Sequence, residues 1–565
     1  MTKPSNRDTS RRGFLHASTL SVVGAGATVL GGVSAQAQAP VAPERSPTPA
    51  AGLNTPAAAG SIFHIARTAY GRVQGIENAG IKSFKGVPYG APTGGRNRFM
   101  PPKKPAAWTG VRECFSWGGV CPQTPSDLRS DYGQMIMWDR HVGDGPMGED
   151  CLVLNVWTPG VDRARRAVLV SFHGGGWTTG SGNFPGFDGH QLARYGDVVV
   201  VTVCYRLASY GYTHLADLGA PPEFAYAGVT GVMDMTASLE WVRDNIAEFG
   251  GDPSRVMIFG QSGGGAKTST LLGTPAAKGL FHRAAVQSGS ALRLATRERA
   301  TRSAEMLLAE LGLTKGRIAD LQKASWQQLL VAQTAATAKG ASFSPVKDGR
   351  YLPHDPFDPT APGESADVPI IVSTTLEDAA LRLTNFDLDE AGLTRVLDQR
   401  FTGRGAEIAR LYRRNAPRKT AYLLQAQALT DSGARRAAER QVELKHAQGR
   451  APAYLYLWSW PSPAYDGKFG AVHGVDVSAS FHAYRDQSVG SGDARGRKMC
   501  DRLASTWVAF AKTGDPNNPE IPRWEPYDPQ TRPTMVFDDD TRLERDPRSE
   551  IRKYWAGQPP PSPQG

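Results

Sequence analysis

The strongest constraint on what this chain can fold into lies at residues 256–272. Residues 256–259 (Val-Met-Ile-Phe) predict a short buried strand, and residues 266–272 can continue as a helix. Between them stands Gly-Gln-Ser-Gly-Gly-Gly, which fits the pattern G-x-S-x-G. A strand, a tight glycine turn and a helix would place Ser262 at a helix N-terminus, where unpaired N–H groups favour a developing anion. The pattern predicts a reactive serine, and the alternative is a glycine-rich loop with an incidental serine.

The segments before this turn predict the surrounding sheet. Residues 152–157, 167–172 and 198–203 are apolar and rich in β-branched side chains, as expected for strands covered on both faces. Residues 231–249 predict an amphipathic helix, because apolar residues recur three or four positions apart at Val232, Met235, Leu239, Val242, Ile246 and Phe249. A strand, a helix and a strand ending in the reactive turn predict an α/β fold, with a doubly wound sheet and a site at the carboxyl ends of its strands. Residues 70–76 and 81–89 predict a small antiparallel edge.

A second glycine motif follows the predicted strand at 167–172. The sequence His-Gly-Gly-Gly-Trp at 173–177 would bring backbone N–H groups close to a bound oxygen without an intervening side chain. Its position, one strand and one helix before the serine turn, favours an oxyanion-binding loop over a merely flexible turn.

Charge and motif content narrow the possible partners. The formal net charge is +10, but no dense basic run with interleaved aromatic residues occurs, which argues against a nucleic-acid partner. The sequence has no H-E-x-x-H motif, no Cys₂His₂ spacing and no Walker loop. We therefore expect no metal and no organic cofactor.

The N-terminal region predicts export. Residues 10–15 (Ser-Arg-Arg-Gly-Phe-Leu) resemble a twin-arginine motif, and A-x-A cleavage patterns end at Ala37 and Ala39. We expect a signal peptide at 1–37, an Ala/Pro-rich disordered linker at 38–60, one domain at 61–557 and a disordered tail at 558–565. No stretch predicts a permanent membrane anchor. A periplasmic or secreted bacterial protein, monomeric or weakly dimeric, is expected.

Five cysteines leave at least one thiol unpaired. Cys204 directly follows the apolar run 198–203 and is expected to be a buried free thiol. Export would permit a disulfide, and Cys121 with Cys151 is the first choice, closing a loop worth about 3–4 kcal/mol. Spacing alone leaves the pairing open and assigns no role to Cys114 or Cys500.

Taken jointly, motifs spread over residues 70–537 resemble the type-B carboxylesterase family. This α/β-hydrolase group includes bacterial para-nitrobenzyl esterases, animal carboxylesterases and cholinesterases. The matching segments are Lys-Gly-Val-Pro-Tyr at 85–89, Arg-Phe at 98–99, Cys-Pro-Gln at 121–123, Glu-Asp-Cys-Leu at 149–152, the motif at 173–177, Tyr-Arg-Leu at 205–207, the turn at 259–264, Gln-Ser-Gly at 287–289, His-Gly at 473–474 and Thr-Gly-Asp-Pro-Asn at 513–517.

The resemblance implies a large, mostly parallel twisted sheet with helical cap insertions and a Ser–Glu–His triad. Ser262 would be the nucleophile, Glu377 the acid and His473 the base. Asp378 is the alternative acid, and His482 is the weaker candidate base. The implied oxyanion-hole donors are the N–H groups of Gly175, Gly176 and Gly263.

Further features follow from the same resemblance. It supports the Cys121–Cys151 disulfide and implies a structural ion pair between Arg98 and Glu149. Two departures stand beside the nucleophile: Gln261 occupies a position where cholinesterases have glutamate, and Gly263 one where alanine is usual.

The expected function is hydrolysis of small-molecule carboxylic esters through an acyl-enzyme intermediate. An amidase, peptidase or lactonase using the same triad is the first alternative, and a non-catalytic binding protein is the second. The segments 290–360 and 393–445 are expected to cap the sheet and shape the pocket. The expected pocket walls are Trp138, Trp177, Phe187 and Tyr212.

Overall fold

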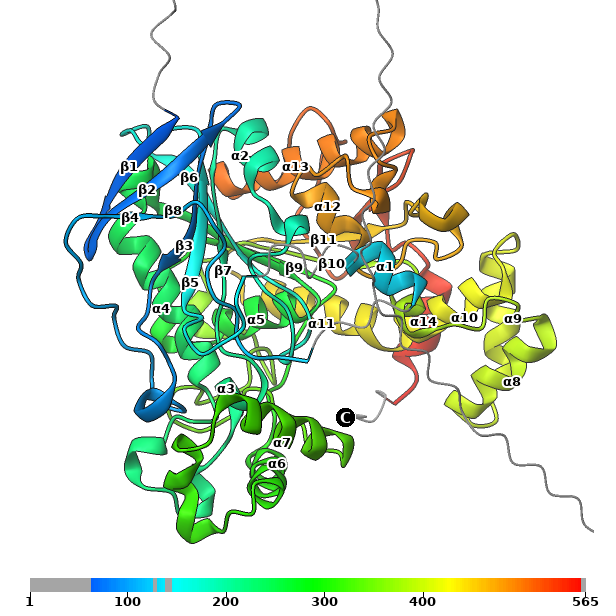
Figure 1. Cartoon of the computed structure of the whole chain (residues 1–565). Helices are drawn as coiled ribbons and strands as arrows, with labels where there is room; N and C mark the ends of the chain where they lie inside the picture. The colour runs from blue at the N-terminus through cyan, green and yellow to red at the C-terminus, as the bar shows by residue number, and fades with distance from the viewer. Residues whose placement is uncertain (1–61, 125–129, 138–144, 560–565) are drawn as a thin grey trace, which may run out of the picture. The chain divides into compact units, whose positions relative to one another are not determined.

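A computed structural model describes residues 62–124, 130–137 and 145–559. The predicted signal peptide and linker, Trp138 and most of the predicted tail lie outside these residues. Within them, a central sheet of 13 strands runs through the protein. Every neighbouring pair from β7 to β12 is parallel, and antiparallel pairs complete both ends of the sheet (Figure 1).

The spatial order is β1-β2-β3-β5-β7-β6-β8-β9-β10-β11-β12-β13, with β4 paired to β2. The bounds of the strands are β1 Phe63–Thr68, β2 Gly71–Asn78, β3 Ile81–Pro88, β4 Val111–Glu113, β5 Val153–Thr158, β6 Arg166–Phe172, β7 Val199–Val203, β8 Gly251–Gln261, β9 Arg283–Gln287, β10 Ile370–Thr375, β11 Ala453–Trp458, β12 Pro533–Phe537 and β13 Arg542–Arg545. The predicted doubly wound α/β architecture and its antiparallel edge are confirmed.

Helices cover both faces of the sheet, because successive side chains of each central strand enter opposite cores. In β8, Val256 and Ile258 belong to the core beneath α4 (Thr230–Asn245), whereas Met257 and Phe259 belong to the core beneath α13 (Ala494–Thr513). β6 and β7 alternate in the same way. Strands buried on both faces explain the unbroken apolar runs of the sequence.

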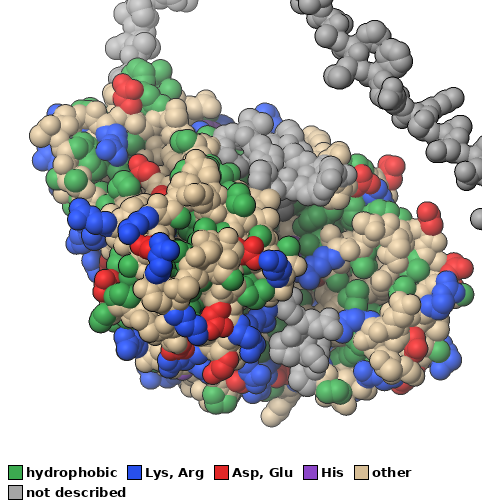
Figure 2. Space-filling model, turned by 60° about the horizontal axis from the view of Figure 1, so that its bottom comes forward, with side chains coloured by type: hydrophobic (Ala, Val, Ile, Leu, Met, Phe, Trp, Pro, Cys, Tyr) green, Lys and Arg blue, Asp and Glu red, His purple; other side chains and the backbone are tan. Residues whose placement is uncertain are grey.

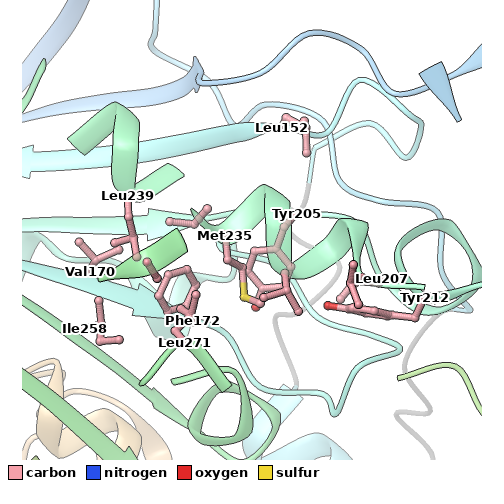
Figure 3. Packing of buried hydrophobic residues seen from close by; sticks show 14 of the residues in the cluster. Leu152, Val170, Phe172, Tyr205, Leu207, Tyr212, Met235, Leu239, Ile258 and Leu271 are labelled. Atoms are coloured by element: carbon pink, nitrogen blue, oxygen red, sulfur yellow. The ribbon is translucent and has the colours of Figure 1, made fainter. Parts of the chain in front are cut away.

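The amphipathic helix predicted at 231–249 is confirmed as α4 followed by a 3₁₀ turn at Ile246–Phe249. All six of its predicted apolar positions are fully buried. Met235 and Leu239 of this helix pack against Phe172 and Ile258 of the sheet (Figure 3). Gly250 ends the helix in the left-handed conformation, at φ 75°.

The remaining helices are α1 Asp131–Met137, α2 His190–Gly196, α3 Ala208–Tyr212, α5 Gly263–Leu272, α6 Arg297–Glu310, α7 Trp326–Ala338, α8 Glu390–Phe401, α9 Gly405–Asn415, α10 Ala421–Thr430, α11 Arg436–Ala447, α12 Val475–Ser480 and α14 Ser549–Ala556. A small core of their own joins α8, α9, α10 and α14. Of these four helices, α8, α9 and α10 belong to the segment predicted at 393–445, whereas α14 comes from the C-terminal end of the domain.

One local expectation is corrected. All five cysteines are buried and none of them forms a disulfide in the described structure, so the disulfide expected between Cys121 and Cys151 is not formed. Of the tail expected from residue 558, only Gln558 and Pro559 are described, and their carbonyl oxygens accept hydrogen bonds from Arg436.

The buried ion pair implied between Arg98 and Glu149 is confirmed. Two parallel hydrogen bonds of 2.6 Å join the guanidinium to the carboxylate. Arg98 also donates to the carbonyl oxygens of Leu321 and Ala324, so the pair ties an N-terminal loop to the segment between α6 and α7.

The surface agrees with the dispersed charge of the sequence. On the face shown in Figure 2, lysine and arginine side chains are interspersed with aspartate and glutamate. Among the helices of the described residues, none combines the length and the apolar character that a membrane crossing requires.

Candidate active site

The turn after β8 holds Ser262 in a strained conformation. Its backbone has φ 60° and ψ −125°, and α5 begins at the next residue. A side chain at Gly264 would place its Cβ 2.0 Å from the carbonyl oxygen of Phe172, and one at Gly260 would lie 2.5 Å from the backbone of Gly264. Only glycines allow this approach of strand and helix, so the sequence pattern dictates the local geometry.

The glycine loop after β6 lies beside this turn. Gly175 and Gly176 adopt positive φ values of 85° and 59°. Gly176 packs directly on Gly263, because a Cβ at Gly263 would lie 2.3 Å from the Gly176 carbonyl oxygen. The N–H groups of Gly175, Gly176 and Gly263 donate no hydrogen bond to any described residue. They are available to a negatively charged oxygen, as the sequence predicts.

A cavity of about 250 Å³ opens over these groups. Ser262, His473, Gly175 and Gly176 all border it. The apolar part of its wall comes from Ile136, Phe184, Phe187, Leu381 and Val477. Ser262 and His473 are thus brought to one site from positions 211 residues apart, although no hydrogen bond joins their side chains in the described structure. Such bonds often tighten only when substrate is present.

The carboxylate that binds His473 is Asp378. Nδ1 of His473 lies 2.9 Å from Oδ1 of Asp378, and Oδ2 of Asp378 accepts a hydrogen bond from the Thr375 hydroxyl. This arrangement leaves Nε2 of the imidazole as the nitrogen that is not engaged by the acid. The alternative acid considered from the sequence is therefore the one that the structure places against the base.

Glu377, the first choice for the acid, is wrong as the partner of His473. Its carboxylate is fully buried and points to the other side, where it accepts hydrogen bonds from the amide of Gln427 and the backbone N–H of Ala471. Lys419 completes an ion pair with it at 2.9 Å. The backbone of Glu377 forms an isolated bridge to Val472, and a 3₁₀ turn begins at Asp378, so the two adjacent side chains take different directions. Counting positions from the strand end could not resolve which of the two adjacent carboxylates meets His473.

The ionisation of the pair suits proton transfer. Burial lowers the pKa of His473, but the charge of Asp378 and its hydrogen bond outweigh burial, so the pKa is raised above its usual 6.5. Burial raises the pKa of Asp378, and the adjacent imidazole and hydrogen-bond donors outweigh it, so this carboxyl has a lowered pKa. Arg382, at the cavity wall, acts in the opposite direction to Asp378 and lowers the pKa of His473.

The predicted pocket walls and the alternative base lie in different places. Phe187 lines the cavity as predicted. Trp177 and Tyr212 do not: they pack edge to face against each other, and Tyr212 is buried in the core. Trp138 lies outside the described residues. His482, the weaker candidate base, bonds Asp501 and stacks on Tyr195, away from the cavity.

The structure adds wall residues that the sequence did not single out. Tyr132, Arg382 and Asp486 border the cavity from three separate segments. No motif marks these positions, since only tertiary packing brings them together. The segments 290–360 and 393–445 contribute no residue to this wall, contrary to expectation.

The described residues contain no group of three or more His, Cys, Asp or Glu side chains that could hold a metal ion. The chemistry available from the described side chains is that of a serine, an imidazole and a carboxylate beside three backbone N–H groups.

Comparison with known proteins gives a consistent match. The profile described as "Carboxylesterase family" matches residues 63–555. The chain is 33% identical to the para-nitrobenzyl esterase of Bacillus subtilis, covering 86% of this chain and 98% of that protein. It is 32% identical to the phenmedipham hydrolase of Pseudarthrobacter oxydans, covering 84% and 95%. The crystal structure of a Geobacillus stearothermophilus carboxylesterase at pH 6.2 aligns with a TM-score of 0.75 at 32% identity, over 87% of this chain and 99% of that one.

Proposed function

Because this chain belongs to the carboxylesterase family, and is therefore a hydrolase of the carboxylic-ester class, we propose that it cleaves small-molecule esters with Ser262, His473 and Asp378 as its catalytic triad. The observation that carries the proposal is the joint placement of Ser262 and His473 on one cavity, with Asp378 bound to the imidazole at 2.9 Å.

The proposed reaction has two steps. His473 takes the proton from the Ser262 hydroxyl as the serine oxygen bonds to the ester carbonyl carbon. The carbonyl oxygen becomes an anion and receives hydrogen bonds from Gly175, Gly176 and Gly263. The alcohol then leaves with the proton from His473, and water repeats the sequence to release the acid. Asp378 holds the imidazole in the required tautomer and stabilises its charged form.

The size of the cavity supports small substrates. About 250 Å³ with a partly apolar wall suits a short acyl or alcohol group better than a long chain. The amide, peptide and lactone alternatives use the same groups, and no feature of the described site favours one of them over an ester. A purely non-catalytic role is disfavoured because the serine and its partners are all present.

A para-nitrophenyl ester panel of graded acyl length, with organophosphonate labelling, tests the proposal. We expect hydrolysis of short-chain esters and labelling at Ser262 in the native protein. Ser262→Ala should lose both, with a fall in kcat of about 10⁴–10⁶. The far-ultraviolet circular dichroism of the variant should stay native. Full hydrolysis by this variant would refute the assignment.

We also propose that the N-terminal segment directs export through a twin-arginine route, as residues 10–15 suggest. Replacing Arg11 and Arg12 by lysine should retain the protein in the cytoplasm of a bacterial host. Cell fractionation followed by an esterase assay measures this. Unchanged export of the double variant would contradict the proposal.

A further inference from the structure

Lys267 is a buried lysine with no carboxylate partner among the described residues. It lies on α5, five positions after the proposed nucleophile, and its side chain is fully buried. Burying an ammonium group without a counter-ion is costly unless other groups stabilise it. Burial lowers the pKa of this lysine to about 7, which reflects how thoroughly water is excluded from it.

The groups that stabilise Lys267 belong to the glycine loop after β6 and to its neighbours. Nζ donates to the carbonyl oxygen of Gly176 at 2.5 Å and to that of His173 at 3.1 Å. The rings of Trp177 and Tyr205 lie with their centroids 5.3 Å from the same atom. The lysine therefore anchors both ends of the tripeptide Gly174–Gly175–Gly176 from beneath.

The glycine loop at 174–176 needs such an anchor because glycine restricts the backbone dihedral angles less than other residues do. The carbonyl oxygen of Gly175 is held within the loop by the N–H groups of Thr178 and Thr179. In the described structure, Lys267 is the one donor to the carbonyl oxygen of Gly176. That carbonyl belongs to the residue whose N–H faces the developing oxyanion in the proposed reaction. Rotation of this residue would turn the donor away from the substrate.

Gly263 completes the contact from the opposite side. A Cβ at this position would lie 2.3 Å from the carbonyl oxygen of Gly176 and 2.4 Å from its nitrogen. The absence of a methyl group at 263 thus lets Gly176 approach α5 closely enough to reach Lys267. Gly263 and Lys267 therefore both contact the backbone of Gly176.

We propose that Lys267 is a positioning residue of the oxyanion hole, which fixes the orientation of Gly176 through its hydrogen bonds to the glycine loop. The inference rests on the function proposed above. Lys267 touches the loop and not the substrate, so it acts through Gly176 and is not itself a catalytic residue.

The test compares Lys267→Met with the native enzyme. Methionine keeps the length and apolar stem of the side chain but removes the charge and the donors. We expect kcat to fall by about 10- to 100-fold with KM within about twofold, because the lost interaction operates only in the transition state. Thr270→Val is the matched control: it removes a partly buried hydrogen bond on the same helix, from the Thr270 hydroxyl to the carbonyl oxygen of Ala266, without touching the loop. It should keep native kcat.

Inhibitor pairs distinguish positioning from general destabilisation. A trifluoromethyl ketone forms a tetrahedral oxyanion on the serine, whereas the matching methyl ketone binds mainly as a ground-state analogue. In Lys267→Met the inhibition constant of the trifluoromethyl ketone should rise about tenfold or more, and that of the methyl ketone should change less than about twofold. An equal change in both would overturn the proposal.

Gly263→Ala provides a second route if Lys267→Met does not fold. Its methyl group would push Gly176 away from Lys267, so the same loss in kcat and in trifluoromethyl ketone affinity is expected. If both single variants fold, the double variant should lose little more than either one, since both disturb the same contact. Native kcat in Gly263→Ala, or additive losses, would overturn the positioning role. Failure of the proposed function is distinguishable, because it would appear as an inactive native enzyme or an active Ser262→Ala.

Discussion

The turn after β8 and the turn after β10 each supply one member of the proposed triad, yet they are held in different ways. Gly260 and Gly264 force the first turn by their own close approach, four residues apart. Contacts from far along the chain hold the second turn: Glu377 bonds residues 50 and 94 positions away, and Asp378 bonds His473, 95 positions away. The nucleophile is therefore positioned mainly by glycines within two residues of it, whereas the choice of acid depends on side chains distant in the sequence.

The largest effect on kcat in this comparison is expected at Asp378, the carboxylate that bonds His473. Asp378→Asn should lower kcat by about 10³–10⁴ while the protein stays folded, because an amide cannot stabilise the charged imidazole and can hold the wrong tautomer. Steady-state kinetics on a para-nitrophenyl ester measures the change. A near-native rate would mean that the contact with His473 is not used in catalysis.

Glu377→Gln is the matched variant one residue earlier, and its effect should fall on stability. It removes a fully buried charge that bonds Gln427, Ala471 and Lys419, so unfolding free energy should fall by about 1–3 kcal/mol. We expect kcat to change less than about tenfold. Denaturant unfolding and kinetics on the same preparation separate the two effects, and a loss of rate larger than that of Asp378→Asn would reverse the assignment.

The local turn can be tested by adding one methyl group. Gly264→Ala would bring a Cβ to 2.0 Å from the Phe172 carbonyl oxygen, so strand and helix must separate. We expect a stability loss of about 1–3 kcal/mol, and a loss of activity of about 10²-fold if Ser262 shifts by about 1 Å. Gly363→Ala is the control, since an added Cβ there meets no atom within 4 Å. Equal behaviour of the two variants would contradict the claim that close approach dictates this turn.

The smallest effect concerns pH. His473 must be neutral to act as a base, and its raised pKa predicts that kcat/KM increases with pH through a value above 6.5. Arg382→Gln removes a positive charge that lowers this pKa, so the acid limb should move to higher pH while the plateau stays unchanged. A pH–rate profile at low salt measures the shift. Added salt should reduce the difference between the native enzyme and the variant, because it screens the charge of Arg382. A shift to lower pH would contradict the sign.

Several site features could be predicted because each depends on a short sequence motif. Ser262 stands in a glycine pattern that permits one backbone geometry, and the glycines at 174–176 follow a strand that is recognisable from its apolar run. His473 was predicted from its glycine neighbour and its place in the order of motifs. The choice between Glu377 and Asp378 failed because both follow the same strand and nothing in their neighbours marks the direction of either side chain.

The strands, the helix at 231–249, the serine turn and the glycine loop could be predicted from short segments, since periodicity and steric restriction act between residues close in the chain. Three features required the folded chain: which carboxylate meets His473, which aromatic residues line the cavity, and where the side chain of Lys267 is buried. They depend on side-chain directions and on contacts between residues far apart in the sequence, which no local pattern specifies. A buried polar or charged group is stable only where hydrogen-bonding partners surround it, and the packing of distant segments determines where those partners lie.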